Sequence, residues 1–198
     1  MEWYAAIEQV SSHVVRILTP QGAGTGFLVD LPNKKKLCGI ATASHVVSHA
    51  HLWESPIRII HHSSGKDTLL HFNERAIILN EANDTAMVVF DPGDIPFPTE
   101  ALSLTPEKKY VKPGVEIGWL GFPSVAPDNL CFFSGRVSLW QKGKGYLVDG
   151  VAINGVSGGP AFHGRTDSVS LAGVVSAYIP NQSTGVYRDW ETDRKSVV

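Results

Sequence analysis

Residues 155–160, Gly155-Val156-Ser157-Gly158-Gly159-Pro160, place one serine among three glycines, and a proline ends the segment. Apolar stretches rich in β-branched residues, typical of strands, lie on both sides of it. Glycine adopts backbone conformations that residues with a Cβ atom resist, so a tight loop here can present one hydroxyl and turn its own N–H groups the same way. This is the arrangement that a serine nucleophile in acyl transfer requires.

A serine hydroxyl is a weak nucleophile at neutral pH, so it requires a base beside it and a third group that orients the base. His45, in the segment TASHV, follows an apolar stretch and is the candidate base, since imidazole both takes and returns protons near neutral pH. Asp84, in the segment NDTA, precedes another apolar stretch and is the candidate orienting group. The chain order His, Asp, Ser is that of chymotrypsin and not that of subtilisin or the α/β-hydrolases.

Four segments, in this order, resemble motifs of the trypsin-like (chymotrypsin-fold) serine peptidases, and more closely those of the bacterial Deg/HtrA type than those of the digestive enzymes. The segments are GTGFLV (24–29), TASHV (42–46), NDTA (83–86) and GVSGGP (155–160). The resemblance covers about residues 10–190. It implies an all-β fold of two packed, six-stranded antiparallel Greek-key β-barrels, and a serine endopeptidase that works through an acyl-enzyme with His45, Asp84 and Ser157 as its triad.

The resemblance also implies roles for residues around the triad. The backbone N–H groups of Gly155 and Ser157 are expected to form the oxyanion hole, and Ser176 is expected to donate a hydrogen bond to Asp84. The pocket for the substrate residue before the scissile bond (P1) is expected to be lined by Val151, Asn154, Ser176, Ala177 and Tyr178. None of these carries a charge, so we predict small or medium aliphatic P1 residues.

Val156 stands where the digestive enzymes carry an aspartate that receives a newly cleaved N-terminus. The sequence therefore does not predict activation by N-terminal cleavage.

The length of 198 residues, 43% of them apolar, suits one domain with a sizeable core. We predict a single peptidase domain over residues 1–190, with barrel one at 11–91, a proline-rich crossover at 92–113 and barrel two at 114–190. The predicted strands are 14–18, 26–29, 37–41, 57–60, 75–79 and 87–90 in barrel one, and 115–121, 131–140, 145–151, 160–163, 168–179 and 185–188 in barrel two. Residues 2–10 carry Trp3, Ile7 and Val10 at helical spacing and predict a short helix.

A net charge of −2 without a dense basic run argues against a nucleic-acid partner, and Lys34–Lys36 is interpreted as a solvated turn. No apolar run is long enough for a membrane span, and no secretory signal is visible, so we expect a cytoplasmic protein with a polypeptide substrate. No cofactor is expected. Cys38 and Cys131 fall in different barrels, and both are expected to be buried reduced thiols.

Two other interpretations of the sequence compete with the peptidase. His45 and His49 are four residues apart, which on a helix would suit zinc, but the glutamate of a metalloprotease helix is missing between them, so no metal site is predicted. The alternative from another class is a trypsin-fold binding or sensor module, or a conditionally active protease arm of a larger effector.

The last residues, 191–198, are interpreted as a non-native or truncated tail. Residues 193–198 match what a common sequencing adapter encodes when it is read in frame. A further domain beyond the C-terminus therefore stays open.

Overall fold

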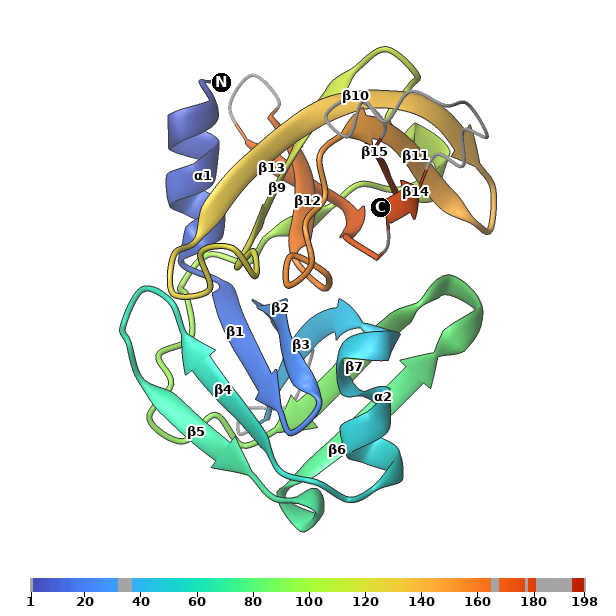
Figure 1. Cartoon of the computed structure of the whole chain (residues 1–198). Helices are drawn as coiled ribbons and strands as arrows, with labels where there is room; N and C mark the ends of the chain where they lie inside the picture. Colours follow the sequence, from blue (N-terminus) through green and yellow to red (C-terminus); the bar gives the residue numbers. More distant parts are fainter. Residues whose placement is uncertain (1, 32–36, 165–167, 177, 181–193, 198) are drawn as a thin grey trace.

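Two β-sheets, one from each half of the chain, pack against each other, and a short helix lies beside each sheet (Figure 1). The computed structural model describes residues 2–31, 37–164, 168–176, 178–180 and 194–197. The predicted strand at 185–188, the predicted turn at Lys34–Lys36 and half of the predicted tail (191–193 and 198) lie outside the described residues. The predicted all-β architecture of two packed sheets is confirmed (Figure 1), although the described sheets have seven and eight strands and not six each.

The first sheet has the strand order β5-β4-β1-β2-β3-β7-β6, and every neighbouring pair is antiparallel. Its strands are β1 (Val14–Thr19), β2 (Gly22–Val29), β3 (Cys38–Ala43), β4 (Ile57–His61), β5 (Asp67–Leu70), β6 (Arg75–Asn80) and β7 (Thr85–Phe90). Strand β5 comes in addition to the six that the sequence predicts. Only Leu70 of its four residues is buried, so its sequence lacks the apolar run that marks the other strands.

The second sheet has the order β14-β15-β11-β10-β9-β12-β13-β8. Its strands are β8 (Ser103–Leu104), β9 (Glu116–Gly121), β10 (Cys131–Gln141), β11 (Gly145–Gly150), β12 (Pro160–Gly164), β13 (Val169–Val174), β14 (Tyr178–Pro180) and β15 (Arg194–Val197). Strand β8 runs parallel to β13, while the other neighbouring pairs are antiparallel. The stretch 168–179, predicted as one strand, holds two, because the chain leaves β13 after Val174 and passes the serine loop before β14 begins.

The helices are short. Helix α1 (Trp3–Ser11) agrees with the prediction for residues 2–10, and helix α2 (Ser44–Leu52) follows β3 directly. Three single-turn 3₁₀ helices, η1 (Phe72–Glu74), η2 (Glu81–Asn83) and η3 (Glu107–Lys109), connect strands. No helix in the described part of the chain is both long and apolar enough to cross a membrane.

A shared apolar core joins the two sheets. Phe27 of β2 lies in one buried cluster with Leu120 of β9 and Phe162 of β12, so side chains from both halves of the chain pack together. Helix α1 closes this cluster, since the ring of Trp3 lies 5.1 Å from that of Phe132 and 5.9 Å from that of Phe162. Each sheet also has a core cluster of its own.

Both cysteines are free thiols. Cys38 is buried as predicted, and burial raises the pKa of its thiol to about 12. The prediction that Cys131 is buried is wrong, because this residue is the first of β10 and is only half-buried there.

Replacing Phe162 by alanine should lower the free energy of unfolding by about 3–5 kcal/mol, the usual cost of deleting a buried phenylalanine ring. Phe162 is 0% exposed and belongs to the core shared by both sheets. Urea unfolding measures the effect. Tyr4→Ala on α1 is the control, since Tyr4 is 72% exposed and its loss should change stability by less than about 0.5 kcal/mol. Equal effects of the two substitutions would contradict the role of the shared core.

Candidate active site

His45 lies in the first turn of α2, where the sequence predicted only the end of a strand. The first N–H groups of a helix have no partner within the helix. Here a distant segment supplies the partners: the Ser44 N–H donates to the Asp84 carbonyl at 3.1 Å, and the His45 N–H donates to Asp84 Oδ1 at 3.0 Å. Asp84 therefore caps α2 and fixes the backbone of His45.

The His45 ring is oriented by the same carboxylate. Nδ1 of His45 lies 2.7 Å from Asp84 Oδ2. An ionised carboxylate only accepts hydrogen bonds, so Nδ1 carries a proton and donates it. In the neutral ring Nε2 is then free to accept a proton. The His45 side chain is 50% exposed, which leaves it open to a substrate.

Asp84 is held in an unusual conformation and a charged state. It follows η2 with φ 48° and ψ 44°, a left-handed conformation that aspartate tolerates better than most residues do. Burial raises the pKa of its carboxyl. Hydrogen bonds from the Ser176 hydroxyl and from the N–H and ring of His45 lower the pKa by more than burial raises it, so the pKa lies below its ordinary value. Asp84 is therefore a carboxylate at neutral pH.

Two glycines of the loop that carries Ser157 have positive φ angles and no room for a Cβ atom. Gly155 has φ +93°, and a Cβ atom there would overlap the carbonyl oxygen of Phe122. Gly158 has φ +87°, and a Cβ atom there would overlap the carbonyl oxygen of Thr25. The loop can follow this path only with glycine at both positions.

Two N–H groups of this loop have no partner in the described part of the chain, and they are those of Gly155 and Ser157. The other three turn inward: Val156 donates to Ile153 at 3.1 Å, Gly158 to Val175 at 2.6 Å and Gly159 to Val156 at 3.0 Å. The loop therefore leaves available the two donors that the sequence predicted for an oxyanion hole.

Thr25 of β2 ties this loop to both sheets. Its N–H donates to the Ser157 carbonyl at 2.8 Å, and its hydroxyl donates to the Gly155 carbonyl at 2.8 Å. The same hydroxyl accepts from the Phe122 N–H at 3.0 Å, at the end of β9. Thr25 is fully buried, so these bonds are protected from water.

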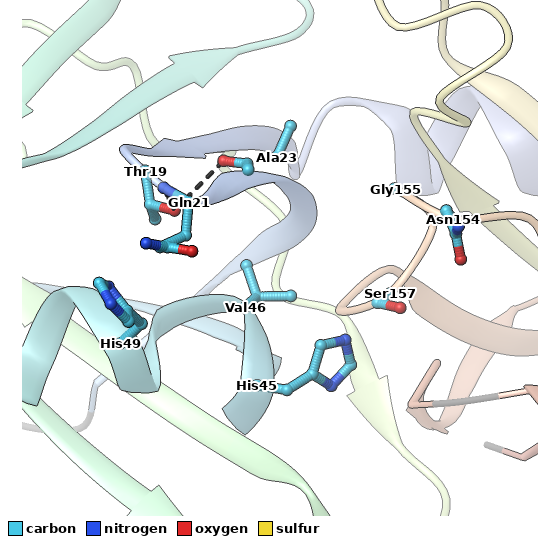
Figure 2. Close-up of a pocket in the computed structure, with 10 residues that line it drawn as sticks. Thr19, Gln21, Ala23, His45, Val46, His49, Asn154, Gly155 and Ser157 are labelled. Carbon is cyan, nitrogen blue, oxygen red and sulfur yellow. Dashed lines mark hydrogen bonds between the residues drawn. The ribbon is translucent and has the colours of Figure 1, made fainter.

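Two cavities meet beside Ser157, and His45 and Asn154 line both of them. The first, of about 260 Å³, extends between α2 and the β1–β2 hairpin. Figure 2 shows this cavity, with the His45 ring reaching from α2 toward the loop that carries Ser157. The second, of about 280 Å³, extends along the other side of the loop toward Ser176.

Only some of the residues predicted to line the P1 pocket line a cavity in the structure. Asn154 and Ser176 line the second cavity, whereas Val151 does not and is 47% exposed. Ala177 lies outside the described residues, and Tyr178 is described only as the first residue of β14. The sequence analysis missed three apolar residues that line this cavity, Ala152, Ile153 and Val175. Their apolar character was a signal, but the path of the loop was needed to tell them from Val151.

The histidines of α2 belong to no metal-binding group within the described part of the chain. His45 and His49 lie one turn apart on the helix. Among the described residues, no group of three or more histidine, cysteine, aspartate or glutamate side chains is placed to hold a metal ion.

Solved structures similar to this chain include a serine endoprotease and HtrA-type proteases. The serine endoprotease from Yersinia pestis has a TM-score of 0.71 at 15% identity, over 100% of this chain and 62% of that chain. The HtrA-type protease AlgW with a tripeptide has a TM-score of 0.67 at 16% identity, over 100% of this chain and 60% of that chain. An inactive mutant form of Rv3671c from M. tuberculosis has a TM-score of 0.65 at 18% identity, over 97% of this chain and 83% of that chain.

Likeness at these identities establishes the fold, which is the trypsin-like fold of the HtrA-type proteases. This chain spans about three fifths of the length of the first two proteins. A scan against protein-family models found no match, and a search of the curated proteins found none either.

Thr25→Val should destabilise the protein by about 1–3 kcal/mol for each buried polar group that it leaves unpaired. The groups are the Phe122 N–H and the Gly155 carbonyl. Urea unfolding measures the loss, and hydrogen exchange should become faster in the serine loop. The control is Thr68→Val on β5, since no described residue bonds the Thr68 hydroxyl. Unchanged exchange in the loop would show that Thr25 does not hold it.

Ser176→Ala should reduce stability in a pH-dependent way, because the Ser176 hydroxyl helps to lower the pKa of Asp84. A carboxyl whose pKa is lower in the folded state stabilises the protein above its unfolded pKa, and this contribution is lost as the pH falls through the folded pKa. Urea unfolding of both proteins across the acid range measures the effect. The difference between them should be full at neutral pH and shrink on acidification; a constant difference would contradict the prediction.

Proposed function

We propose that this chain is a serine-type endopeptidase that hydrolyses peptide bonds through an acyl-enzyme at Ser157. The observation that carries the proposal is the 2.7 Å hydrogen bond from His45 to Asp84 beside the two cavities that Ser157 borders. The fold supports the same conclusion, since its solved neighbours are serine proteases.

In the first half of the reaction, Ser157 Oγ attacks the carbonyl carbon of the scissile peptide bond while Nε2 of His45 takes its proton. The ring then carries a positive charge, which the Asp84 carboxylate stabilises. Negative charge develops on the carbonyl oxygen and is met by the free N–H groups of Gly155 and Ser157, each worth about 3–4 kcal/mol of the barrier. His45 then protonates the leaving amine, and the acyl-enzyme remains.

In the second half, a water molecule replaces the amine. His45 takes a proton from this water, whose oxygen attacks the ester carbon, and returns the proton to Ser157 Oγ as the acid product leaves. No cofactor enters either half.

The second cavity is the proposed P1 pocket. Ala152, Ile153 and Val175 give it apolar walls, and none of its lining residues is a carboxylate, lysine or arginine. A volume of about 280 Å³ suits a small or medium aliphatic side chain and offers no partner to the cation of arginine or lysine.

Activation by N-terminal cleavage is not part of the proposal. Val156 is 0% exposed and packs in the core of the second sheet. Its apolar side chain has no charge that could pair with the α-amino group of a newly cleaved N-terminus.

A conditionally active protease arm, or a binding module with this fold, is the second candidate. One observation favours it: within the described residues the Ser157 hydroxyl has no hydrogen-bond partner, His45 included. Hydrogen bonds of this kind are often loose before substrate binds, so the observation does not exclude catalysis.

A fluorophosphonate probe that reacts with activated serines tests the proposal. The wild-type protein and the control Ser134→Ala, exposed on β10, should be labelled, whereas Ser157→Ala should not. Asp84→Asn should lower kcat for a peptide with an aliphatic P1 residue by about 10⁴-fold, since it places the His45 proton on the wrong nitrogen. Folded wild-type protein that remains unlabelled would overturn the endopeptidase and favour the binding module.

A further inference from the structure

The first cavity lies on the leaving-group side of the proposed reaction. With the P1 side chain in the second cavity, the leaving nitrogen has to come within hydrogen-bond reach of His45. The residues after the scissile bond then continue past His45 toward α2 and the β1–β2 hairpin, where this cavity of about 260 Å³ lies. The inference below rests on the proposed function.

Uncharged side chains with free hydrogen-bond donors line this cavity. The amides of Gln21 and Asn154 make no hydrogen bond to another described residue through their side chains. In Figure 2, Gln21 and Asn154 lie on opposite sides of the cavity. None of the lining residues is a carboxylate, so an acidic side chain would meet donors here without a like charge among them.

His49 supplies a further donor at the end of the cavity farthest from Ser157 (Figure 2). Its Nδ1 is buried and has no hydrogen-bond partner among the described residues. A buried N–H without an acceptor costs about 1–3 kcal/mol, so we assign the proton to Nε2, which is not enclosed in this way. His49 then presents an N–H group and not a lone pair. Its ring is held beside that of Trp53, at a centroid distance of 6.0 Å.

We infer that this cavity selects substrates with an aspartate or glutamate among the first two residues after the scissile bond, and that His49 determines this preference. A carboxylate accepts several hydrogen bonds at once, and bonds to a charged group are stronger than those between neutral groups. Gln21 and His49 line the same cavity from different elements, the hairpin and the helix, so we expect both to donate to one bound carboxylate.

The preference is measured as kcat/KM for peptides that are identical except at those two positions, which carry glutamate, glutamine or leucine. The peptide with glutamate should be cleaved about ten-fold faster than the one with glutamine, because a bond to a charged acceptor exceeds a neutral one by roughly that factor. His49→Leu should abolish the preference, and His49→Gln, which keeps a donor, should retain part of it. The control is His51→Leu on the same helix, since His51 packs on Phe72 and does not line the cavity.

Binding separates the failure of this inference from that of the proposed function. Fluorescence anisotropy of labelled peptides on Ser157→Ala reports recognition without cleavage. Tighter binding of the glutamate peptide, lost in Ser157→Ala/His49→Leu, supports the subsite even if the wild-type protein cleaves nothing. Cleavage or binding that does not distinguish glutamate from glutamine, or a preference that survives in His49→Leu, overturns the inference and leaves the endopeptidase untouched.

Discussion

The hydrogen bonds of Thr25 hold the candidate site together. The buried hydroxyl of Thr25 joins the serine loop to the end of β9. The backbone of the same residue adds two bonds: its N–H donates to the Ser157 carbonyl, and its carbonyl accepts from the Thr42 hydroxyl at 2.7 Å. Residues from both sheets therefore fix one loop, and the absence of side chains at Gly155 and Gly158 lets the strands approach it. The position of Ser157 depends on how the two halves of the chain pack, and not on its own loop alone.

Asp84 plays the corresponding part for His45. One carboxylate caps α2, orients the His45 ring and accepts from Ser176, so the first sheet, the helix and the second half of the chain meet at a single charge. Burial alone would favour the neutral carboxyl, and these hydrogen bonds reverse that preference. The helix start that positions His45 and the electrostatics that orient its ring thus have the same cause, which couples the fold of this region to its proposed chemistry.

The fold could be predicted from the sequence where it depends on short motifs, because each motif requires particular residues. The glycines around Ser157, the segments that carry His45 and Asp84, and the runs of β-branched residues indicated the double barrel. Features that depend on packing could not be predicted in this way. Strand β5 has one buried residue, and α2 begins with a cap from a segment 40 residues away (Ser44 to Asp84). Val151 and Ala152 are both apolar neighbours, yet Ala152 is buried and lines the pocket whereas Val151 is exposed. The proposed roles of the triad and the oxyanion hole remain predictions.

The two cavities beside Ser157 divide the proposed specificity between different parts of the fold. Residues of the second barrel form the apolar pocket, and their positions follow from the same loop that carries the nucleophile. The other cavity lies between the serine loop, with Asn154, and two elements of the first barrel, α2 and the β1–β2 hairpin. The side chains of Gln21 and His49 on those two elements make no hydrogen bond to the serine loop among the described residues. The hydrogen bonds of Thr25 and Asp84 hold Ser157 and His45 without involving the side chains of Gln21 and His49. If the proposed function holds, substitutions at Gln21 or His49 should therefore change the preferred leaving group while the positions of Ser157 and His45 stay the same.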